Sequence, residues 1–182
     1  MRVVSGSRKG IPLKSLPGTN TRPTSDKVKE SVFNIIGPYF DGGTAVELFG
    51  GSGSLSFEAL SRGVDEAFVF EKNVKACAII QANAEKCRFT EEVHIQRADA
   101  RHAVKVLQAA GVKVDLLFVD PPYAETKFYD LVQDFVEADL LSEGAIIVCE
   151  HEKQLALPDA YGLYHKKKSP VYGNVAITIY EK

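Results

Sequence analysis

The arrangement of its apolar segments constrains the fold of this chain more than any other feature. Helical patterns separate the segments, and the clearest one places apolar residues at helical spacing from Phe128 to Leu140. This alternation predicts five strand–helix units and a doubly wound α/β sheet. Two late segments, 161–167 and 174–180, have no helix between them and are expected to pair antiparallel. The five predicted strands are residues 45–49, 67–70, 93–97, 115–119 and 145–149, and the fourth has the apolar run of a strand covered on both faces.

Composition limits the classes of protein to consider. The chain has 182 residues, of which 45% are hydrophobic and 25% charged, so it can build a core and is not disordered as a whole. No apolar run is long enough to span a bilayer, and residues 1–6 lack a signal-peptide pattern. Cys77, Cys87 and Cys149 form no CxxC motif, and the histidines form no HxxxH pair. We therefore expect a cytoplasmic protein without a disulfide framework and without a bound metal.

Charge is distributed unevenly along the chain. Residues 1–29 carry a net charge of +6, whereas the rest of the chain carries −8. The beginning is also rich in Gly, Pro, Ser and Thr, which predicts a basic arm or hairpin over residues 1–25 ahead of one domain over 26–182. Such an arm can dock a phosphate backbone, although a solvated tail would have the same composition. The candidate nucleic-acid-binding residues are Arg2, Arg8, Lys9, Arg22, Lys27 and Lys29.

A glycine-rich turn at residues 50–53 (Gly-Gly-Ser-Gly) follows the first predicted strand. Glycines allow a tight turn and let backbone N–H groups approach a ligand. The turn alone is weak evidence, because Ser56 stands where a dinucleotide fingerprint has its third glycine. Two acids add weight: Glu71 ends the second strand, where it can accept hydrogen bonds from both ribose hydroxyls, and Asp99 follows the third. This edge of the sheet therefore predicts a pocket for an adenosine-containing cofactor.

The fourth predicted strand ends in residues 120–123, Asp-Pro-Pro-Tyr, the most informative tetrapeptide of the chain. Proline restricts the preceding residue to extended geometry, so the Asp120 carboxylate projects from the end of the strand. The two prolines have no N–H group, so the turn presents carbonyl acceptors, and Tyr123 adds an aromatic face. These groups match a planar base with an exocyclic NH₂, which would stack on the ring. The alternative is a Pro-Pro loop with a chance tyrosine.

These motifs resemble those of a known enzyme family. Residues 46–53 (Val-Glu-Leu-Phe-Gly-Gly-Ser-Gly) and 58–63 (Glu-Ala-Leu-Ser-Arg-Gly) resemble motif I of S-adenosylmethionine-dependent methyltransferases, and residues 120–123 resemble their amine-methylating motif IV. Residues 21–34 and the Arg-Val-Val-Ser-Gly opening at 2–6 narrow the match to the RsmD-like bacterial family, which methylates the guanine-N2 amine of 16S ribosomal RNA. The resemblance covers nearly the whole chain. It implies a Rossmann-like class I methyltransferase sheet, mostly parallel, with an antiparallel final strand.

The resemblance also implies roles for individual residues. Residues 50–53 would line the methionine side of the cofactor, Glu71 would hold the ribose and Asp99 the adenine amine. Glu47 stands where the family more often has Asp, so the resemblance does not define which cofactor atom it contacts. Gly51 replaces a common Ala. The implied S-adenosylmethionine-binding residues are Glu47, Phe49, Gly50, Gly51, Ser52, Gly53, Glu71, Lys72, Asp99 and Ala100, and the implied catalytic residues are Asp120, Pro121, Pro122 and Tyr123.

A mechanism and its alternatives follow as hypotheses. The Asp120 carboxylate and the Pro121 carbonyl would accept the two N–H bonds of a flipped guanine amine, so that its lone pair points at the sulfonium methyl group. The partner would be ribosomal RNA or the small ribosomal subunit, and a monomer is favoured. The tetrapeptide also suits the amine of adenine or cytosine in DNA or another RNA. An NAD-binding oxidoreductase and a non-catalytic RNA-binding module are the remaining alternatives.

Overall fold

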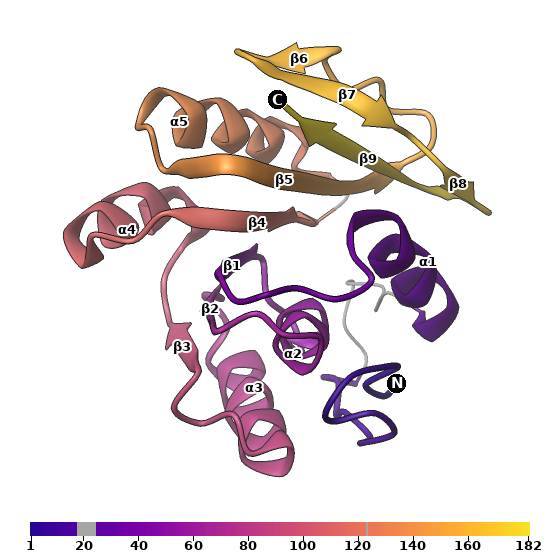
Figure 1. Cartoon of the computed structure of the whole chain (residues 1–182), viewed down its shortest axis with the longest axis vertical. Helices are drawn as coiled ribbons and strands as arrows, with labels where there is room; N and C mark the ends of the chain where they lie inside the picture. Colours follow the sequence, from indigo (N-terminus) through magenta and orange to yellow (C-terminus); the bar gives the residue numbers. More distant parts are fainter. Residues whose placement is uncertain (18–24, 123) are drawn as a thin grey trace.

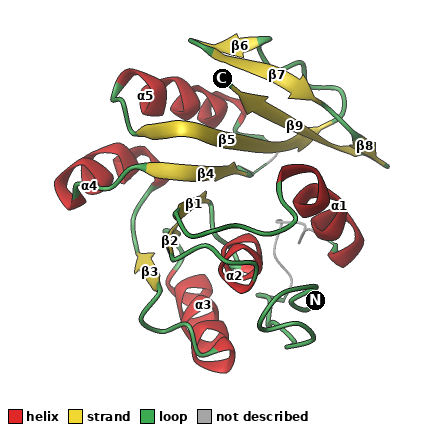
Figure 2. Cartoon of the chain, in the orientation of Figure 1, coloured by secondary structure: helices red, strands yellow, loops and turns green. Residues whose placement is uncertain are grey.

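One mixed β-sheet organises the chain, and helices cover both of its faces (Figures 1 and 2). The computed structural model describes residues 1–17, 25–122 and 124–182. Over these residues the strand order is β3-β2-β1-β4-β5-β9-β7-β6, and β8 pairs with β9. The strands are β1 (Thr44–Leu48), β2 (Glu66–Phe70), β3 (Val93–Gln96), β4 (Val114–Val119), β5 (Leu141–Glu152), β6 (Ala160–Tyr161), β7 (Tyr164–Lys168), β8 (Val171–Tyr172) and β9 (Val175–Glu181).

The helices lie on two sides of this sheet (Figure 1). Helices α1, α2 and α3 share one core with the sheet, and α4 and α5 share a second core with the opposite face. The α-helices are α1 (Asp26–Ile36), α2 (Ser54–Ser61), α3 (Val74–Cys87), α4 (Ala103–Ala110) and α5 (Leu131–Glu137), and two short 3₁₀ helices are η1 (Ala100–His102) and η2 (Thr126–Asp130). Among the described residues, no helix is both long and apolar enough to cross a membrane.

The pairing confirms a doubly wound sheet whose final strand is antiparallel. β1 pairs in parallel with both β2 and β4, while β2 continues to β3 and β4 continues to β5. β5 then pairs antiparallel with β9. The chain therefore builds outward from β1 to β3 and returns to the other side of β1 at β4. The strand order reverses between β1 and β4, which is where such sheets bind ligands.

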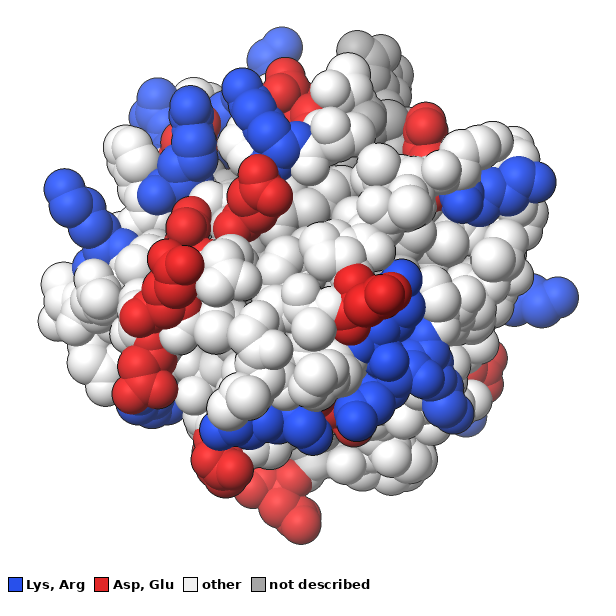
Figure 3. Space-filling view, turned by 90° about the horizontal axis from the view of Figure 1, so that it is seen from above, with Lys and Arg blue, Asp and Glu red and all other residues white. Residues whose placement is uncertain are grey.

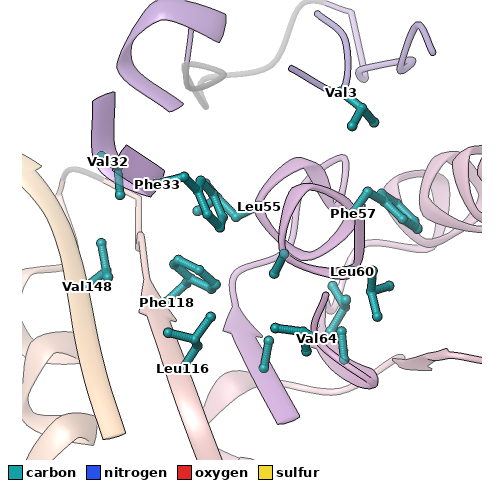
Figure 4. Packing of buried hydrophobic residues seen from close by; sticks show 14 of the residues in the cluster. Val3, Val32, Phe33, Leu55, Phe57, Leu60, Val64, Leu116, Phe118 and Val148 are labelled. Carbon is teal, nitrogen blue, oxygen red and sulfur yellow. The ribbon is translucent and has the colours of Figure 1, made fainter. Parts of the chain in front are cut away.

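The alternation of side chains in the central strands explains why both faces are covered. In β4, Leu116 and Phe118 enter the core beneath α1 and α2, whereas Leu117 and Val119 enter the core beneath α4 and α5. Figure 4 shows Phe33 of α1 beside Phe118, with ring centroids 5.8 Å apart. The uninterrupted apolar run that predicted a strand covered on both faces is confirmed.

Two details of the predicted organisation are wrong. The fifth strand, β5, is twelve residues long and continues into the antiparallel strands, so the described chain has four strand–helix units rather than five. The helix predicted from Phe128 begins as the 3₁₀ helix η2 and ends as α5 at Glu137. Helix α4, between β3 and β4, was not predicted. It buries Ala103 and Leu107, and Val104 and Val106 pack against the same core.

The beginning of the chain forms a hairpin that packs on the domain. Val3 donates its N–H to the Ile11 carbonyl at 2.9 Å and accepts from Gly10 at 2.8 Å. The Val3 side chain is fully buried in the core that contains α2, and the Ser7 N–H binds the Ser61 carbonyl at 2.8 Å. The hairpin interpretation of this segment is confirmed. The division of the chain into an arm and a domain at residue 25 stays a prediction.

Candidate functional site

The glycine turn at residues 50–53 lies at the carboxyl end of β1, beside the reversal of strand order. Phe49 and Gly51 have left-handed backbone angles, with φ of 63° and 59°. A Cβ on Gly50 would lie 2.2 Å from Val69 Cγ1, so only glycine fits against β2 there. A Cβ on Gly51 would meet nothing within 4 Å, so this side of the turn is open. The turn is thus held against the sheet on one side and accessible to a ligand on the other.

Glu71 joins this turn to the next helix. Its Oε1 accepts from the Gly51 N–H at 2.8 Å, and its Oε2 accepts from the Asn73 N–H at 2.9 Å. Asn73 in turn caps α3, accepting from the Ala76 N–H at 3.1 Å. Each carboxylate oxygen can accept two hydrogen bonds, so Glu71 retains acceptor capacity on both oxygens. That capacity suits the hydroxyl groups of a ribose.

Glu47 is buried under the turn rather than open to it. Its Oε1 accepts from the Ser56 N–H at 3.1 Å and from the Ser56 hydroxyl at 2.7 Å. Burial raises the pKa of Glu47 to about 7, although the hydrogen bonds from Ser56 and the charge of Lys29 oppose the shift. Ser56, the residue that departs from the dinucleotide fingerprint, therefore serves as the partner of Glu47. The predicted contact between Glu47 and the cofactor stays a prediction.

Asp99 follows β3 and is held by an arginine that the sequence did not indicate. Asp99 accepts from the Arg101 N–H and Nε, each at 2.9 Å, and from Arg101 Nη2 at 3.0 Å. Hydrogen bonds from Arg101 lower the pKa of Asp99 to about 2, so this carboxylate is ionised at neutral pH. Ala100 is buried in the second core, and Lys72 is exposed.

Asp120 lies at the carboxyl end of β4, and Glu150 lies in the neighbouring strand β5. Burial together with the charge of Glu150 raises the pKa of Asp120 well above its ordinary value. Both acids line a small cavity between α1, α2, β4, β5 and β9, whose other walls are apolar. Pro121 is buried and Pro122 exposed, and Tyr123 lies outside the described residues. The apolar residues that line the cavity are Val32, Leu55, Val119, Val148 and Ile177.

Glu150 lines the site, although the sequence analysis did not include it among the predicted site residues. In the parallel pairing of β4 with β5, Val119 stands opposite Cys149, so the next residue of each strand is an acid. The signal was a glutamate directly after an apolar strand. It could be used only with the knowledge that these two strands are neighbours.

The basic residues that were predicted to bind RNA differ in burial, and Lys29 and Arg8 are not exposed. The Lys29 side chain is fully buried, and its Nζ donates to the Arg2 carbonyl at 2.6 Å and to Ser54 Oγ at 3.0 Å. The prediction that Lys29 binds RNA is therefore wrong, because solvent and phosphate cannot reach it. Arg8 is half-buried, with its Nε bound to the Cys87 carbonyl at 2.6 Å and its guanidinium over the Phe89 ring.

The other predicted basic residues are on the surface or undescribed. Arg2 is exposed and lies 3.6 Å from Asp26, and Lys9 and Lys27 are exposed. Arg22 lies outside the described residues. On the face shown in Figure 3, basic side chains gather in patches that border acidic ones.

Lys27 and Lys168 line an open groove between α1 and the β7–β8 region. Ser31 and Asn34 of α1 also line it, and Ser31 Oγ lies 2.6 Å from the Tyr172 hydroxyl of β8. Helix α1 also contributes Val32 to the cavity of Asp120. The groove therefore has two exposed cations and one exposed acid, Glu30, on a helix that also borders the Asp120 cavity.

The chain is similar over its whole length to curated bacterial proteins. The profile of a family described as conserved hypothetical protein 95 matches residues 1–181. YlbH of Bacillus subtilis (strain 168), named as a candidate rRNA methyltransferase, is 41% identical over 182 residues, which cover 100% of this chain and 99% of YlbH. Ribosomal RNA small subunit methyltransferase D of Escherichia coli (strain K12) is 27% identical over 184 residues, which cover 100% and 90% of the two chains.

Solved structures share the fold. A conserved hypothetical protein of Streptococcus pyogenes superposes with a TM-score of 0.79 at 38% identity, covering 84% of this chain and 94% of that one. YhhF of Escherichia coli, described as a candidate methyltransferase, superposes with a TM-score of 0.82 at 26% identity. That match covers 100% of this chain and 97% of YhhF.

Proposed function

The chain belongs to the conserved hypothetical protein 95 family, the RsmD-like methyltransferases, and we propose that it methylates the N2 amine of a guanine in small-subunit (16S) ribosomal RNA. Its fold is the Rossmann-like class I methyltransferase fold, as the sequence predicted. The observation that carries the proposal is the placement of Asp120. The first residue of the amine-methylating motif stands one strand away from an open glycine turn, on the same edge of the sheet.

The methyl donor in this proposal is S-adenosylmethionine, and the residues at the edge of the sheet fit its adenosine part. The ribose hydroxyls and the adenine amine are hydrogen-bond donors, and Glu71 and Asp99 are acceptors at the ends of β2 and β3. The open side of Gly51 leaves room beside the turn. When bound, S-adenosylmethionine supplies an electrophilic methyl group. Phe49 and Lys72 remain proposed cofactor contacts, as do the other residues of the implied set.

Asp120 and the Pro121 carbonyl would hold the target base. The guanine amine is a poor nucleophile because its lone pair is delocalised into the ring. Two acceptors on its two N–H bonds favour a pyramidal nitrogen with a lone pair directed at the methyl carbon. Alignment of this kind can contribute on the order of 7–11 kcal/mol to lowering the barrier. Tyr123 is proposed to stack on the base.

The groove between α1 and the β7–β8 region is the proposed path of the RNA backbone. Replacing Lys27 and Lys168 together with glutamine should weaken RNA binding and lower the slope of log K against log salt by about 1 to 2, because each phosphate contact releases roughly 0.7–0.9 of a counterion. The measurement is a fluorescence-anisotropy titration at several salt concentrations. The control replaces exposed Lys75 and Lys105, on α3 and α4, with glutamine. An equal slope in both double variants would rule out the groove.

Transfer of tritium from labelled S-adenosylmethionine tests the function directly. The acceptors are transcribed 16S rRNA, isolated small ribosomal subunits and DNA, and nuclease digestion with chromatography of the product identifies the methylated base. We expect N2-methylguanine in one of the two ribosomal acceptors. Methyladenine or methylcytosine, or label in DNA alone, would instead support the alternative amine substrates. No transfer to any acceptor would contradict the proposal. The cytoplasmic location and the monomeric state stay predictions.

A further inference from the structure

We propose that Asn83 of α3 is a positioning residue that holds the glycine turn at residues 50–53 in its ligand-binding shape and ties it to the N-terminal hairpin (residues 1–14). Cofactor binding and docking of the hairpin on the domain then favour each other. The inference rests on the proposed S-adenosylmethionine site. It goes beyond that proposal because Asn83 belongs to none of the motifs that identified the site.

Asn83 is a polar residue on the buried face of α3. It is fully buried, on the same side of the helix as Ile80 and Cys87. Ile80 supports the glycine turn: a Cβ on Gly53 would lie 3.3 Å from Ile80 Cγ2, and one on Gly50 would lie 3.4 Å from Ile80 Cδ1. Asn83 follows Ile80 by about one helical turn. A buried amide without hydrogen bonds would destabilise the fold, so the contacts of Asn83 indicate why it stands there.

The Asn83 amide joins two segments that are distant in the sequence. Its Nδ2 donates to the Ser52 carbonyl at 2.9 Å and to the Lys14 carbonyl at 3.0 Å. Its Oδ1 accepts from the Lys14 N–H at 2.8 Å. The set requires two N–H donors and one acceptor on a short side chain. Aspartate has no N–H donor, and glutamine is longer by one methylene group.

The bond to Ser52 fixes one peptide group of the glycine turn. This peptide group has the Ser52 carbonyl at one end and the Gly53 N–H at the other. The Gly53 N–H donates to the Gly50 carbonyl at 2.8 Å, so the turn itself holds that end. Asn83 holds the other end. The shape of the turn, with its open side available to a ligand, therefore depends on a residue outside the turn.

The bonds to Lys14 fix the returning segment of the hairpin beside the same turn (Figure 1). The neighbouring Leu13 is buried in the core that contains α2, and its N–H donates to the Met1 carbonyl at 2.9 Å. Met1 Sδ lies 4.0 Å from the Ser52 hydroxyl, so the first residue of the hairpin also reaches the turn. Opening of the hairpin would release the Asn83 amide from Lys14. Two sites that share such an element are coupled in both directions.

Binding of S-adenosylhomocysteine to the full chain tests the effect on the turn without methyl transfer. By calorimetric titration, we expect Asn83→Ala to raise Kd by about 10-fold, because the turn would be in its binding shape for only a fraction of the time. Asn83→Asp keeps an acceptor for the Lys14 N–H but has no donor for Ser52, so it should raise Kd as well. In kinetics, Asn83→Ala should raise KM for S-adenosylmethionine with little change in kcat, since the turn binds the ground state and the transition state alike.

Ser61→Ala is the matched control for loss of hairpin contacts. Ser61 Oγ donates to the Ser5 carbonyl at 2.6 Å and accepts from the Arg8 N–H at 2.9 Å. Ser61 is as polar and nearly as buried as Asn83, but its printed bonds reach the hairpin alone. The variant should therefore loosen the hairpin and keep Kd within about 2-fold of the wild type, as long as the docked state remains the major one.

Hydrogen exchange tests the coupling from the side of the hairpin. Saturating S-adenosylhomocysteine should slow exchange of the Val3 and Gly10 amides in the wild type by about the factor by which Asn83→Ala raises Kd, because coupling is reciprocal. In Asn83→Ala the ligand should leave these rates unchanged. If Asn83→Ala does not fold, the wild type decides alone, and exchange that the ligand does not slow would overturn the coupling.

The outcomes separate this inference from the proposed function. If the wild type binds S-adenosylhomocysteine and both Asn83 variants bind it as tightly as Ser61→Ala, the role of Asn83 is wrong and the proposed function stands. Equal slowing of hairpin exchange by the ligand in the wild type and in Asn83→Ala would also overturn the role. If the wild type binds no S-adenosylhomocysteine, the proposed function fails and this inference fails with it.

Discussion

Replacing Asp120 with alanine is expected to lower the rate of methyl transfer by about 10² to 10⁴-fold, the usual range for loss of a positioned proton acceptor. The variant would leave the Pro121 carbonyl as the only acceptor proposed for the amine, so the nitrogen would lose its alignment with the methyl group. Binding of S-adenosylmethionine should change little, because its proposed contacts lie at Glu71, Asp99 and the glycine turn. Initial rates of tritium transfer and calorimetric titration of the cofactor measure the two effects separately.

Two further variants make the Asp120 result specific. Asp120→Asn keeps the shape of the side chain and one acceptor oxygen but carries no charge, so its rate should lie between those of the wild type and the alanine variant. Asp134→Asn, an exposed change on α5, should behave as the wild type. Normal turnover in Asp120→Ala with normal cofactor affinity would exclude Asp120 from the chemistry.

The sequence predicted those parts of the fold that depend on local patterns. The strands 45–49 and 67–70 were placed within one residue of β1 and β2, because a buried parallel strand is mostly apolar. The glycine turn is also a local signal, since the Gly53 N–H closes it on the Gly50 carbonyl three residues back. The continuation of β5 to Glu152 was missed because its last three residues are polar and are held by pairing with β9.

Contacts between distant segments could not be predicted from the sequence. Lys29 was counted as a surface cation, yet the structure buries it against a carbonyl of the hairpin and a serine of α2. A charge count does not reveal which cations are buried, since burial depends on where the first residues fold back. Glu150 was left out of the predicted site for the same reason. Asp120 is thirty positions away and becomes its neighbour only when β4 and β5 align.

The burial of Lys29 leads to a large expected effect on stability, centred on Glu58 of α2. The Glu58 side chain is fully buried and accepts from the Val4 N–H at 2.8 Å, the Ser5 N–H at 3.1 Å and Arg62 Nε at 2.7 Å. Lys29 Nζ lies 3.5 Å from its Oε1. One carboxylate thus joins the N-terminal hairpin, α1 and α2, and it balances two buried cations.

Glu58→Gln is expected to reduce the free energy of unfolding by about 3–5 kcal/mol, because Arg62 would remain buried without its anion and Lys29 would keep only Asp26, whose Oδ1 lies 3.9 Å from Nζ. The measurement is the urea midpoint and slope, with exposed Glu30→Gln on α1 as the matched control. Adding Lys29→Met to Glu58→Gln should restore about 1 kcal/mol or more, since one of the two stranded charges is then removed. A loss below about 0.5 kcal/mol in Glu58→Gln, the size of an ordinary surface change, would show that the cluster does not hold the hairpin to the domain.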